Sequence, residues 1–312
     1  MSVMAAPEVN PSAALYIKLG ERGKWESECL KEQQTLRIGF EEVRHSVWSE
    51  DRWSEVRALY EKVGARVASG FANQIQLFYE AGRDVLWITF YAARLWWCFS
   101  EPRVTVLPDG SKTRPVIGTW MSCDIQNRPL DIARLSGRLV MLQRYQGTIC
   151  SVGHERLEYL IRKINSRNEP EVDAAKSARS SLQEAVETIV GRLHWRDFEL
   201  LVDLVFRQAG WMRVDELGGT QKTFDLVLVS PITGERYDVQ VKAQADLVAF
   251  EEYERQVGGM EGFSRFYFAV HSPSPDLEQV ETVGRVKLLR SAEVAELSVR
   301  YGLVDWVIDK AG

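Results

Sequence analysis

The sequence has no excess of basic residues. Its 312 residues include 39 Lys and Arg against 44 Asp and Glu, a net charge of -5, and the isoelectric point is near 5.6. A protein that binds nucleic acid indiscriminately normally carries a basic footprint. The composition therefore argues against indiscriminate binding of this kind, although a local basic surface can coexist with an acidic whole.

Cysteine pairs and long apolar runs are also missing. The four cysteines, Cys29, Cys98, Cys123 and Cys150, form no C-x-x-C pair and have no histidine nearby. This spacing argues against a zinc site and predicts free thiols in a reducing compartment. No run approaches the length of a membrane span, and residues 1–7 lack the basic and apolar regions of a signal peptide. We expect a cytoplasmic protein without membrane association.

The length and composition favour two globular domains. The chain exceeds the usual size of one domain, and its 45% hydrophobic and 27% charged content is typical of globular proteins. The polar, proline-containing stretch Asn165–Glu171 predicts the boundary. We expect an N-terminal domain over residues 12–165, a connecting helix over 166–190 and a C-terminal domain over 191–312. No internal repeat or low-complexity tract is evident.

The most informative pattern is a hairpin in the C-terminal domain. The runs 224–229 and 237–242 are rich in Val, Leu and aromatic residues with period-two alternation, and residues 231–234 between them supply turn residues. If that segment is the loop, Ser230 faces Glu235 and Asp225 lies opposite Gln240, with Lys242 further along the same face. A register slip of one residue would separate Asp225 from Gln240.

The elements around this hairpin resemble a known family. A helix is predicted from His194 to Phe206, ending near Gly210, and residues 217–220 form a glycine-containing connection before Asp225. In this order, Phe198-Glu199, Gly210-Trp211, Gly218-Gly219, Asp225 and Gln240-Val241-Lys242 resemble the PD-(D/E)xK nuclease superfamily, and most closely its Mrr-type restriction endonuclease branch. The resemblance covers residues 190–290 and implies a mixed sheet flanked by helices.

The resemblance also implies a chemistry for these residues. Phosphodiester hydrolysis needs a positioned water and neutralisation of charge at phosphorus, both of which Mg²⁺ can supply, and Mn²⁺ can substitute. Asp225 would be the principal ligand, the Gln240 side-chain oxygen and the Val241 carbonyl lesser ones, and Glu199 a direct or water-mediated one. Lys242 would orient the attacking water or stabilise the developing charge.

Three residues near the hairpin leave alternatives open. Gln240 is a neutral amide where most of the superfamily has Asp or Glu, and it is interpreted as a feature of the Mrr-type branch, with weaker metal binding or a lost nuclease activity as the alternatives. Asp238 is interpreted as an exposed charge, with an accessory ligand as the alternative. His271 follows the apolar strand 266–270 and is interpreted as structural rather than catalytic.

The remaining C-terminal elements are predicted from their patterns. The run 243–253 is expected to be an amphipathic helix, and the end of the chain is expected to form a strand over 286–289, a helix over 292–299 and a closing helix or strand over 303–308.

The N-terminal domain is predicted to be a mixed sheet or small barrel with helices. We expect strands at 14–19, 35–40, 85–91, 94–99, 137–142 and 147–150, and a helix from residue 51 to about 78. The early lysine-containing strand, Trp25 after a glycine-rich turn and the paired Gly-Arg-Asp-Val-Leu-Trp and Leu-Trp-Trp runs loosely resemble the PUA-like group that includes EVE and YTH domains. That resemblance implies an aromatic pocket for a modified base, for which Trp25, Trp97 and Trp120 are candidates, with burial in the core as the alternative.

These features lead to one hypothesis and one alternative. The hypothesis is a two-domain, modification-sensing DNA endonuclease of restriction or antiviral defence, and cutting both strands would favour a homodimer. The alternative is a non-catalytic subunit that binds nucleic acid or a nucleotide. The candidates for a local basic surface are Arg134, Arg138, Arg144, Arg213, Lys222, Arg236 and Arg255. The alternative is that they are isolated, solvated surface charges.

Overall fold

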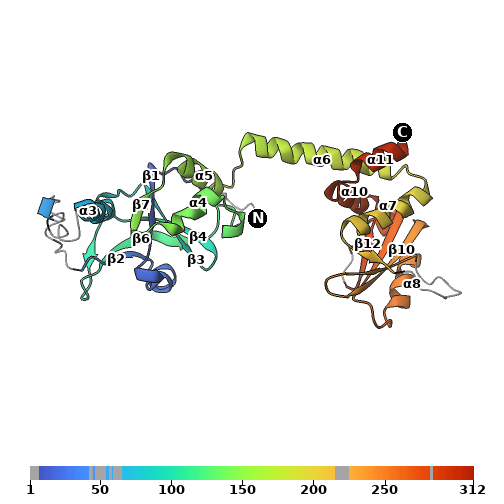
Figure 1. Ribbon diagram of the computed structural model, residues 1–312, viewed down its shortest axis with the longest axis horizontal. Coiled ribbons are helices and arrows are strands. Elements are labelled where there is room, and N and C mark those ends of the chain that lie inside the picture. Colours follow the sequence, from blue (N-terminus) through green and yellow to red (C-terminus); the bar gives the residue numbers. More distant parts are fainter. Residues whose placement is uncertain are drawn as a thin grey trace. The chain divides into compact units, whose positions relative to one another are not determined.

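The computed structural model describes residues 7–41, 45, 54, 55, 58, 65–214, 225–281 and 284–312. The chain divides into two compact units, Met1–Glu169 and Pro170–Gly312 (Figure 1). We call them the first and the second unit and describe each by itself. No helix in the described part is long and apolar enough to cross a membrane.

The first unit is built on a mixed seven-stranded sheet in the order β2-β6-β4-β3-β1-β7, with β5 paired to β6. β1 and β3 are parallel and the other neighbours antiparallel. The strands are β1 (Ala13–Ile17), β2 (Thr35–Ile38), β3 (Val85–Tyr91), β4 (Arg94–Ser100), β5 (Thr105–Val106), β6 (Lys112–Met121) and β7 (Ile149–Ser151). The β3–β4 hairpin turns at Ala92 and Ala93, whose φ angles of 50° and 58° are those of a type I′ turn.

Helices cover both faces of this sheet. One face carries α3 (Ala65–Glu80), whose Ile75 and Phe78 pack against Trp87 of β3. The other carries α4 (Gly137–Val140) and α5 (His154–Ile164), which pack against Leu86 and Ile88 of the same strand. β3 thus contributes side chains to both cores, because successive side chains of a strand point to opposite faces.

Two predictions for the first unit need correction. Residues 137–142 are not a strand: α4 is followed by a 3-10 helix over Met141–Arg144. The cause is local, because the Ser136 hydroxyl caps the helix by accepting a hydrogen bond from the Leu139 amide, and Leu139 and Leu142 are buried at helical spacing. The helix expected over 51–78 is described as α3 only from Ala65 onward, and most of the residues before it lie outside the described part. The long strand β6 and the helix α5 were not predicted.

The second unit contains a five-stranded mixed sheet in the order β12-β11-β10-β9-β8. β10, β11 and β12 are parallel, whereas β9 pairs antiparallel with β10 and β8 antiparallel with β9. The strands are β8 (Met212–Arg213), β9 (Leu226–Val229), β10 (Arg236–Ala245), β11 (Arg265–Pro273) and β12 (Val286–Leu289). The helices are α6 (Pro170–Val190), α7 (Trp195–Gln208), α8 (Leu247–Val257), α9 (Pro275–Glu278), α10 (Ser291–Arg300) and α11 (Val304–Ala311).

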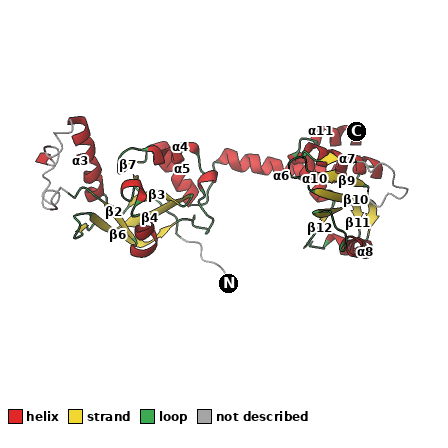
Figure 2. Cartoon of the chain, turned by 60° about the horizontal axis from the view of Figure 1, so that its bottom comes forward, coloured by secondary structure: helices red, strands yellow, loops and turns green. Residues whose placement is uncertain are grey.

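Helices lie on both sides of this sheet (Figure 2), and each face has its own apolar core. On one face α6, α7, α10 and α11 pack against alternating strand residues such as Val239 and Ala269. On the other face α8 and α9 cover Phe266, Phe268 and Val270. The mixed α/β fold class predicted from the sequence is confirmed. The strand and the helix predicted near the end of the chain are β12 and α10, and the closing element is the helix α11.

The segment after Lys242 differs from the prediction. The expected helix over 243–253 begins only at Leu247, because β10 continues through Ala245 and stays paired with β11, with Ala245 opposite Pro273. Asp246 forms the boundary: its side chain caps α8 by accepting a hydrogen bond of 2.9 Å from the Ala249 amide.

Candidate active site

The register of the β9–β10 hairpin brings the two central candidates together. Val229 pairs with Arg236 and Leu226 with Val239, so Asp225, directly before β9, lies opposite Gln240. The turn is closed by a 2.9 Å hydrogen bond from the Ser230 amide to the Glu235 carbonyl. The register predicted from the loop length is therefore confirmed.

The Asp225 carboxylate is held by the strand opposite. Its Oδ2 accepts a short hydrogen bond from the Gln240 side-chain amide and one of 2.7 Å from the Val241 backbone amide. Because the Gln240 amide nitrogen donates to Asp225, its Oε1 is the atom left for another partner. The half-buried Asp225 carboxylate is thus fixed in direction, and its Oδ1 accepts no hydrogen bond from any residue that the structure describes.

Asp238 is not the exposed charge that we expected. Its side chain is 0% exposed, beneath α8, and its Oδ2 accepts a 2.5 Å hydrogen bond from the Tyr253 hydroxyl. The other oxygen, Oδ1, is buried and has no hydrogen-bond partner within the described part of the chain. Burial, together with the nearby negative charge of Asp225, raises the pKa of Asp238 to about 7, although the Tyr253 hydrogen bond opposes the change.

Lys242 follows Gln240 on the same face of β10. Alternation places Asp238, Gln240 and Lys242 on the side of the sheet that α8 covers, whereas Val239 and Val241 face the opposite core. The Lys242 side chain is exposed. It makes no hydrogen bond or ion pair to any described residue, and so its ammonium group is available to a ligand.

Glu199 lies on a different layer of the unit. It is half-buried on α7, the helix whose Phe198, Leu201 and Val202 pack on the face opposite to Asp238. Among the described residues no hydrogen bond or ion pair connects Glu199 with Asp225 or Gln240. The more buried carboxylate of this helix is Asp203, which forms an ion pair of 2.8 Å with Arg207.

Oxygen donors at the hairpin fit a hard cation, although the carboxylates are few. In the part of the chain that the structure describes, no three His, Cys, Asp or Glu side chains are grouped to hold a metal ion. The donors present are the free Oδ1 of Asp225, the unpartnered Oδ1 of Asp238 and Oε1 of Gln240. Carboxylate and amide oxygens are the ligands that Mg²⁺ and Mn²⁺ prefer, and a buried acceptor without a donor is a position that a cation can satisfy.

His271 has structural partners. Its Nε2 lies 3.1 Å from the Val190 carbonyl and its Nδ1 lies 2.8 Å from the Ser272 hydroxyl. The ring also packs edge-on against Phe198, with centroids 5.1 Å apart. These contacts connect β11 to α6 and α7, away from the face of Gln240, and support the structural interpretation.

The candidates for a basic surface have different surroundings. Arg213 forms an ion pair with Asp203 at 3.8 Å, and the Arg236 guanidinium lies 5.4 Å from the centre of the Phe263 ring. Arg255 is exposed, as are Arg134 and Arg144 in the first unit, where Arg138 pairs with Glu155 at 2.9 Å. Lys222 and the glycines of the 217–220 segment lie outside the described residues.

The three tryptophans proposed for base recognition are buried and lie in two different cores. Trp25 and Trp120 belong to the core beneath α3, whereas Trp97 belongs to the core beneath α5, with exposures of 8%, 4% and 8%. The Trp97 indole donates a 2.8 Å hydrogen bond to the Cys123 carbonyl, and the Trp120 indole one of 3.1 Å to the Thr35 carbonyl. The structure therefore does not bring the three rings around one pocket.

Trp25 does lie at a cavity. The cavity has a volume of about 380 Å³ and is lined by the segment after β1, the segment after β2 and the segment before β7. Two cations already lie over the indole, with Lys24 Nζ and the Arg37 guanidinium carbon each 4.3 Å from the ring. The lining is charged with both signs and includes Lys18, Glu21, Arg22, Lys24 and Glu41.

Comparisons with known proteins give two weak structural neighbours. One is the MspJI restriction endonuclease in complex with a 27-mer oligonucleotide, at 15% identity and a TM-score of 0.28, covering 80% of this chain and 70% of that one. The other is the DNA modification-dependent restriction endonuclease AspBHI, at 11% identity and a TM-score of 0.27, covering 90% and 80%. No protein-family model and no curated protein matches the sequence.

Proposed function

We propose that the chain is a metal-dependent DNA endonuclease whose hydrolytic site lies on the β9–β10 hairpin. The observation that carries the proposal is the register that sets Asp225 against Gln240 and places Lys242 on the same face. A fixed carboxylate, an amide oxygen and an ammonium group on one face of the hairpin can hold a cation and stabilise the charge that develops in phosphodiester hydrolysis.

The residues of the hairpin have distinct proposed roles. Asp225, Gln240 and the Val241 carbonyl would hold Mg²⁺ or Mn²⁺, and Glu199, which lies on the helix of the opposite face, would contribute only through bound water. The cation, when bound, supplies positive charge to the phosphate and lowers the pKa of a bound water. The backbone amide of Val241 keeps Asp225 oriented, which limits the reorganisation needed on binding. Lys242 directs the attacking water or stabilises charge that develops on the phosphate oxygens.

For the first unit we propose the selection of a modified base, which makes the protein a type IV-like restriction endonuclease of the Mrr type. The support is the cavity beside Trp25, which offers an aromatic ring and cations to a flipped base. Trp97 and Trp120 would then act indirectly, by fixing the strands around it. Cleavage of both strands would require two sites, and we propose a homodimer for that reason.

One observation favours a second candidate function. Gln240 is neutral and donates to Asp225, and the described residues contain no cluster of three metal-ligating carboxylates, histidines or cysteines. Such a site suits a non-catalytic subunit that binds nucleic acid or a nucleotide within a defence complex. In that case Asp225 and Gln240 would close the hairpin rather than hold a cation.

The test is cleavage of unmodified and base-modified DNA with Mg²⁺ or Mn²⁺. We expect wild type to cut, and both Asp225→Ala and Lys242→Ala to lose at least a hundredfold in rate, as for removal of groups that stabilise the transition state. The matched controls are Glu261→Ala, an exposed carboxylate, and Lys287→Ala, an exposed strand lysine, and both should cut as wild type does. Wild type that binds DNA but cuts none of these substrates would favour the binding subunit instead.

A further inference from the structure

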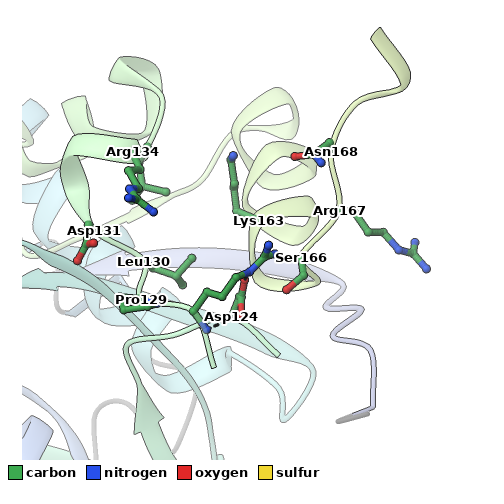
Figure 3. A pocket seen from close by; sticks show the side chains of 11 residues that line it. Asp124, Pro129, Leu130, Asp131, Arg134, Lys163, Ser166, Arg167 and Asn168 are labelled. Carbon is green, nitrogen blue, oxygen red and sulfur yellow. Dashed lines mark hydrogen bonds and ion pairs between the residues drawn. The ribbon is translucent and has the colours of Figure 1, made fainter. Parts of the chain in front are cut away.

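The first unit contains a pocket, separate from the cavity at Trp25, that four cations line (Figure 3). Its volume is about 170 Å³. Arg128 comes from the turn after β6, Arg134 from the 3-10 helix Ile132–Arg134, Lys163 from the last turn of α5 and Arg167 from the segment after α5. The four residues thus come from separate segments of one unit, and the Arg167 side chain extends away from the others (Figure 3).

Two of the four cations have no acidic partner. Arg128 pairs with Asp124 at 2.8 Å, and Arg167 pairs with Glu8. By contrast, Arg134 and Lys163 make no hydrogen bond or ion pair with any residue that the structure describes, although Lys163 Nζ lies 5.5 Å from the centre of the Tyr159 ring. They are the two cations whose charge is available to a ligand.

The acidic groups of the pocket do not compensate these charges. Asp124 accepts hydrogen bonds from the Gln126 and Arg128 backbone amides and from the Arg128 side chain. The pKa of Asp124 stays below its usual value, despite burial that opposes this, because of these hydrogen bonds. The other carboxylate, Asp131, pairs with Arg94 at 3.4 Å. Asp124 thus offsets the charge of Arg128 within the pocket, and Asp131 is paired with Arg94 outside the lining, so that Arg134 and Lys163 leave the pocket with a net positive charge.

The C-terminal end of α5 forms one wall of the pocket and is closed by its own backbone hydrogen bonds. The Ser166 amide donates to the Lys163 carbonyl at 3.2 Å and the Arg167 amide to the Arg162 carbonyl at 2.8 Å, the paired bonds of a Schellman motif. These bonds satisfy carbonyl oxygens that would otherwise repel an anion at the C-terminal end of a helix. Ser166 adopts a φ of 58° at the position that glycine usually occupies, and its buried hydroxyl oxygen lines the pocket.

We propose that this pocket binds a phosphate group through Arg134 and Lys163. Guanidinium and ammonium groups are the preferred partners of phosphate oxygens, the first by paired hydrogen bonds and the second as a point charge. The phosphate belongs either to a DNA backbone or to a free nucleotide. In the first case the pocket positions DNA for the proposed nuclease, and this part of the proposal rests on the proposed function.

The test compares DNA binding by full-length variants in EDTA, where metal-dependent cleavage cannot proceed. The variant is Arg134→Ala/Lys163→Ala, and the matched control is Arg103→Ala/Lys176→Ala, which removes the same charge from exposed positions that have no ion-pair partner among the described residues. We expect the variant to bind a labelled duplex about tenfold more weakly at 0.1 M salt, with the salt dependence of log K reduced by about 1 to 2. The control should bind as wild type does.

A second arm identifies the source of the phosphate. If a free nucleotide is the ligand, calorimetry will show that a deoxynucleoside monophosphate binds to wild type and not to the Arg134→Ala/Lys163→Ala variant. In that case the variant will bind DNA with the same affinity as wild type. If the variant matches the control in both arms, the proposal is wrong.

Two further measurements show whether the loss of binding comes from the charge or from damage to the fold. The charge-conserving variant Arg134→Lys/Lys163→Arg should recover most of the binding, and thermal unfolding of all variants detects a purely structural role at the end of α5. If wild type needs the pocket for binding but cuts no DNA, the proposed function fails while the phosphate site stands.

Discussion

The buried carboxyl group of Asp238 gives the most quantitative prediction. It is 0% exposed, and burial together with the Asp225 charge raises its pKa to about 7 from an ordinary value of 3.8. In the unfolded chain the group ionises near its ordinary value. Ionisation therefore favours the unfolded state, and the stability of the second unit should be highest below pH 4, should fall as the pH rises toward 7 and should level off above it.

The magnitude follows from the two pKa values. Each unit of difference between the pKa values of the folded and the unfolded chain corresponds to about 1.4 kcal/mol. The Asp238 carboxylate therefore lowers the free energy of unfolding by about 4 kcal/mol above pH 7. Asn has the same shape, keeps an oxygen to accept from Tyr253 and carries no charge. We therefore expect Asp238→Asn to stabilise the second unit by about 2 to 4 kcal/mol at pH 8 and by less than about 0.5 kcal/mol at pH 4.

Hydrogen exchange of the 236–245 segment, in EDTA and corrected for the intrinsic pH dependence of exchange, measures this stability locally. The control is Glu261→Gln, an exposed carboxylate whose removal should leave protection unchanged at both pH values. A protection difference between Asp238→Asn and wild type that is the same at pH 4 and pH 8 would refute the reasoning, because the effect would then not come from ionisation.

Three further predictions concern stability. Tyr253→Phe removes the hydroxyl that bonds Asp238 and should destabilise the second unit by about 1 to 3 kcal/mol at pH 8, and less at pH 4, in the same exchange assay. Asp246→Ala removes the cap of α8 and should cost about 1 kcal/mol, measured by urea unfolding, whereas Asp246→Asn should retain most of it. Arg114→Met should destabilise the first unit by about 3 kcal/mol or more in thermal unfolding, because the fully buried guanidinium bonds the carbonyl oxygens of Phe78, Ala81 and Glu101.

The parts of the site that sequence patterns predicted are those set by local rules. The β9–β10 register follows from alternation and from the length of the loop, and the facing positions of Asp225 and Gln240 follow from the register. The β3–β4 hairpin was predictable for the same reason. In both cases the residues that determine the geometry are a few positions apart in the sequence.

Features set by distant contacts could not be predicted in this way. Asp238 is two residues from Gln240 on a strand face that reads as solvated, and only the packing of Tyr253 from α8 reveals that it is buried. The strand β6 was missed because Lys112, Arg114 and Pro115 interrupt its apolar pattern. Two of those residues are buried charges whose acceptors lie far away in the sequence: Lys112 donates to the Phe40 carbonyl, and Arg114 to carbonyls at the end of α3.

The most direct test of the hydrolytic site is calorimetric binding of Mn²⁺ by the full-length chain. The account predicts that wild type and Glu261→Ala bind the ion, and that Asp225→Ala loses at least tenfold in affinity, since the principal carboxylate ligand is gone. Binding that Asp225→Ala retains, or no binding by wild type, would contradict the metal site and leave the hairpin as a structural feature of a DNA- or nucleotide-binding subunit.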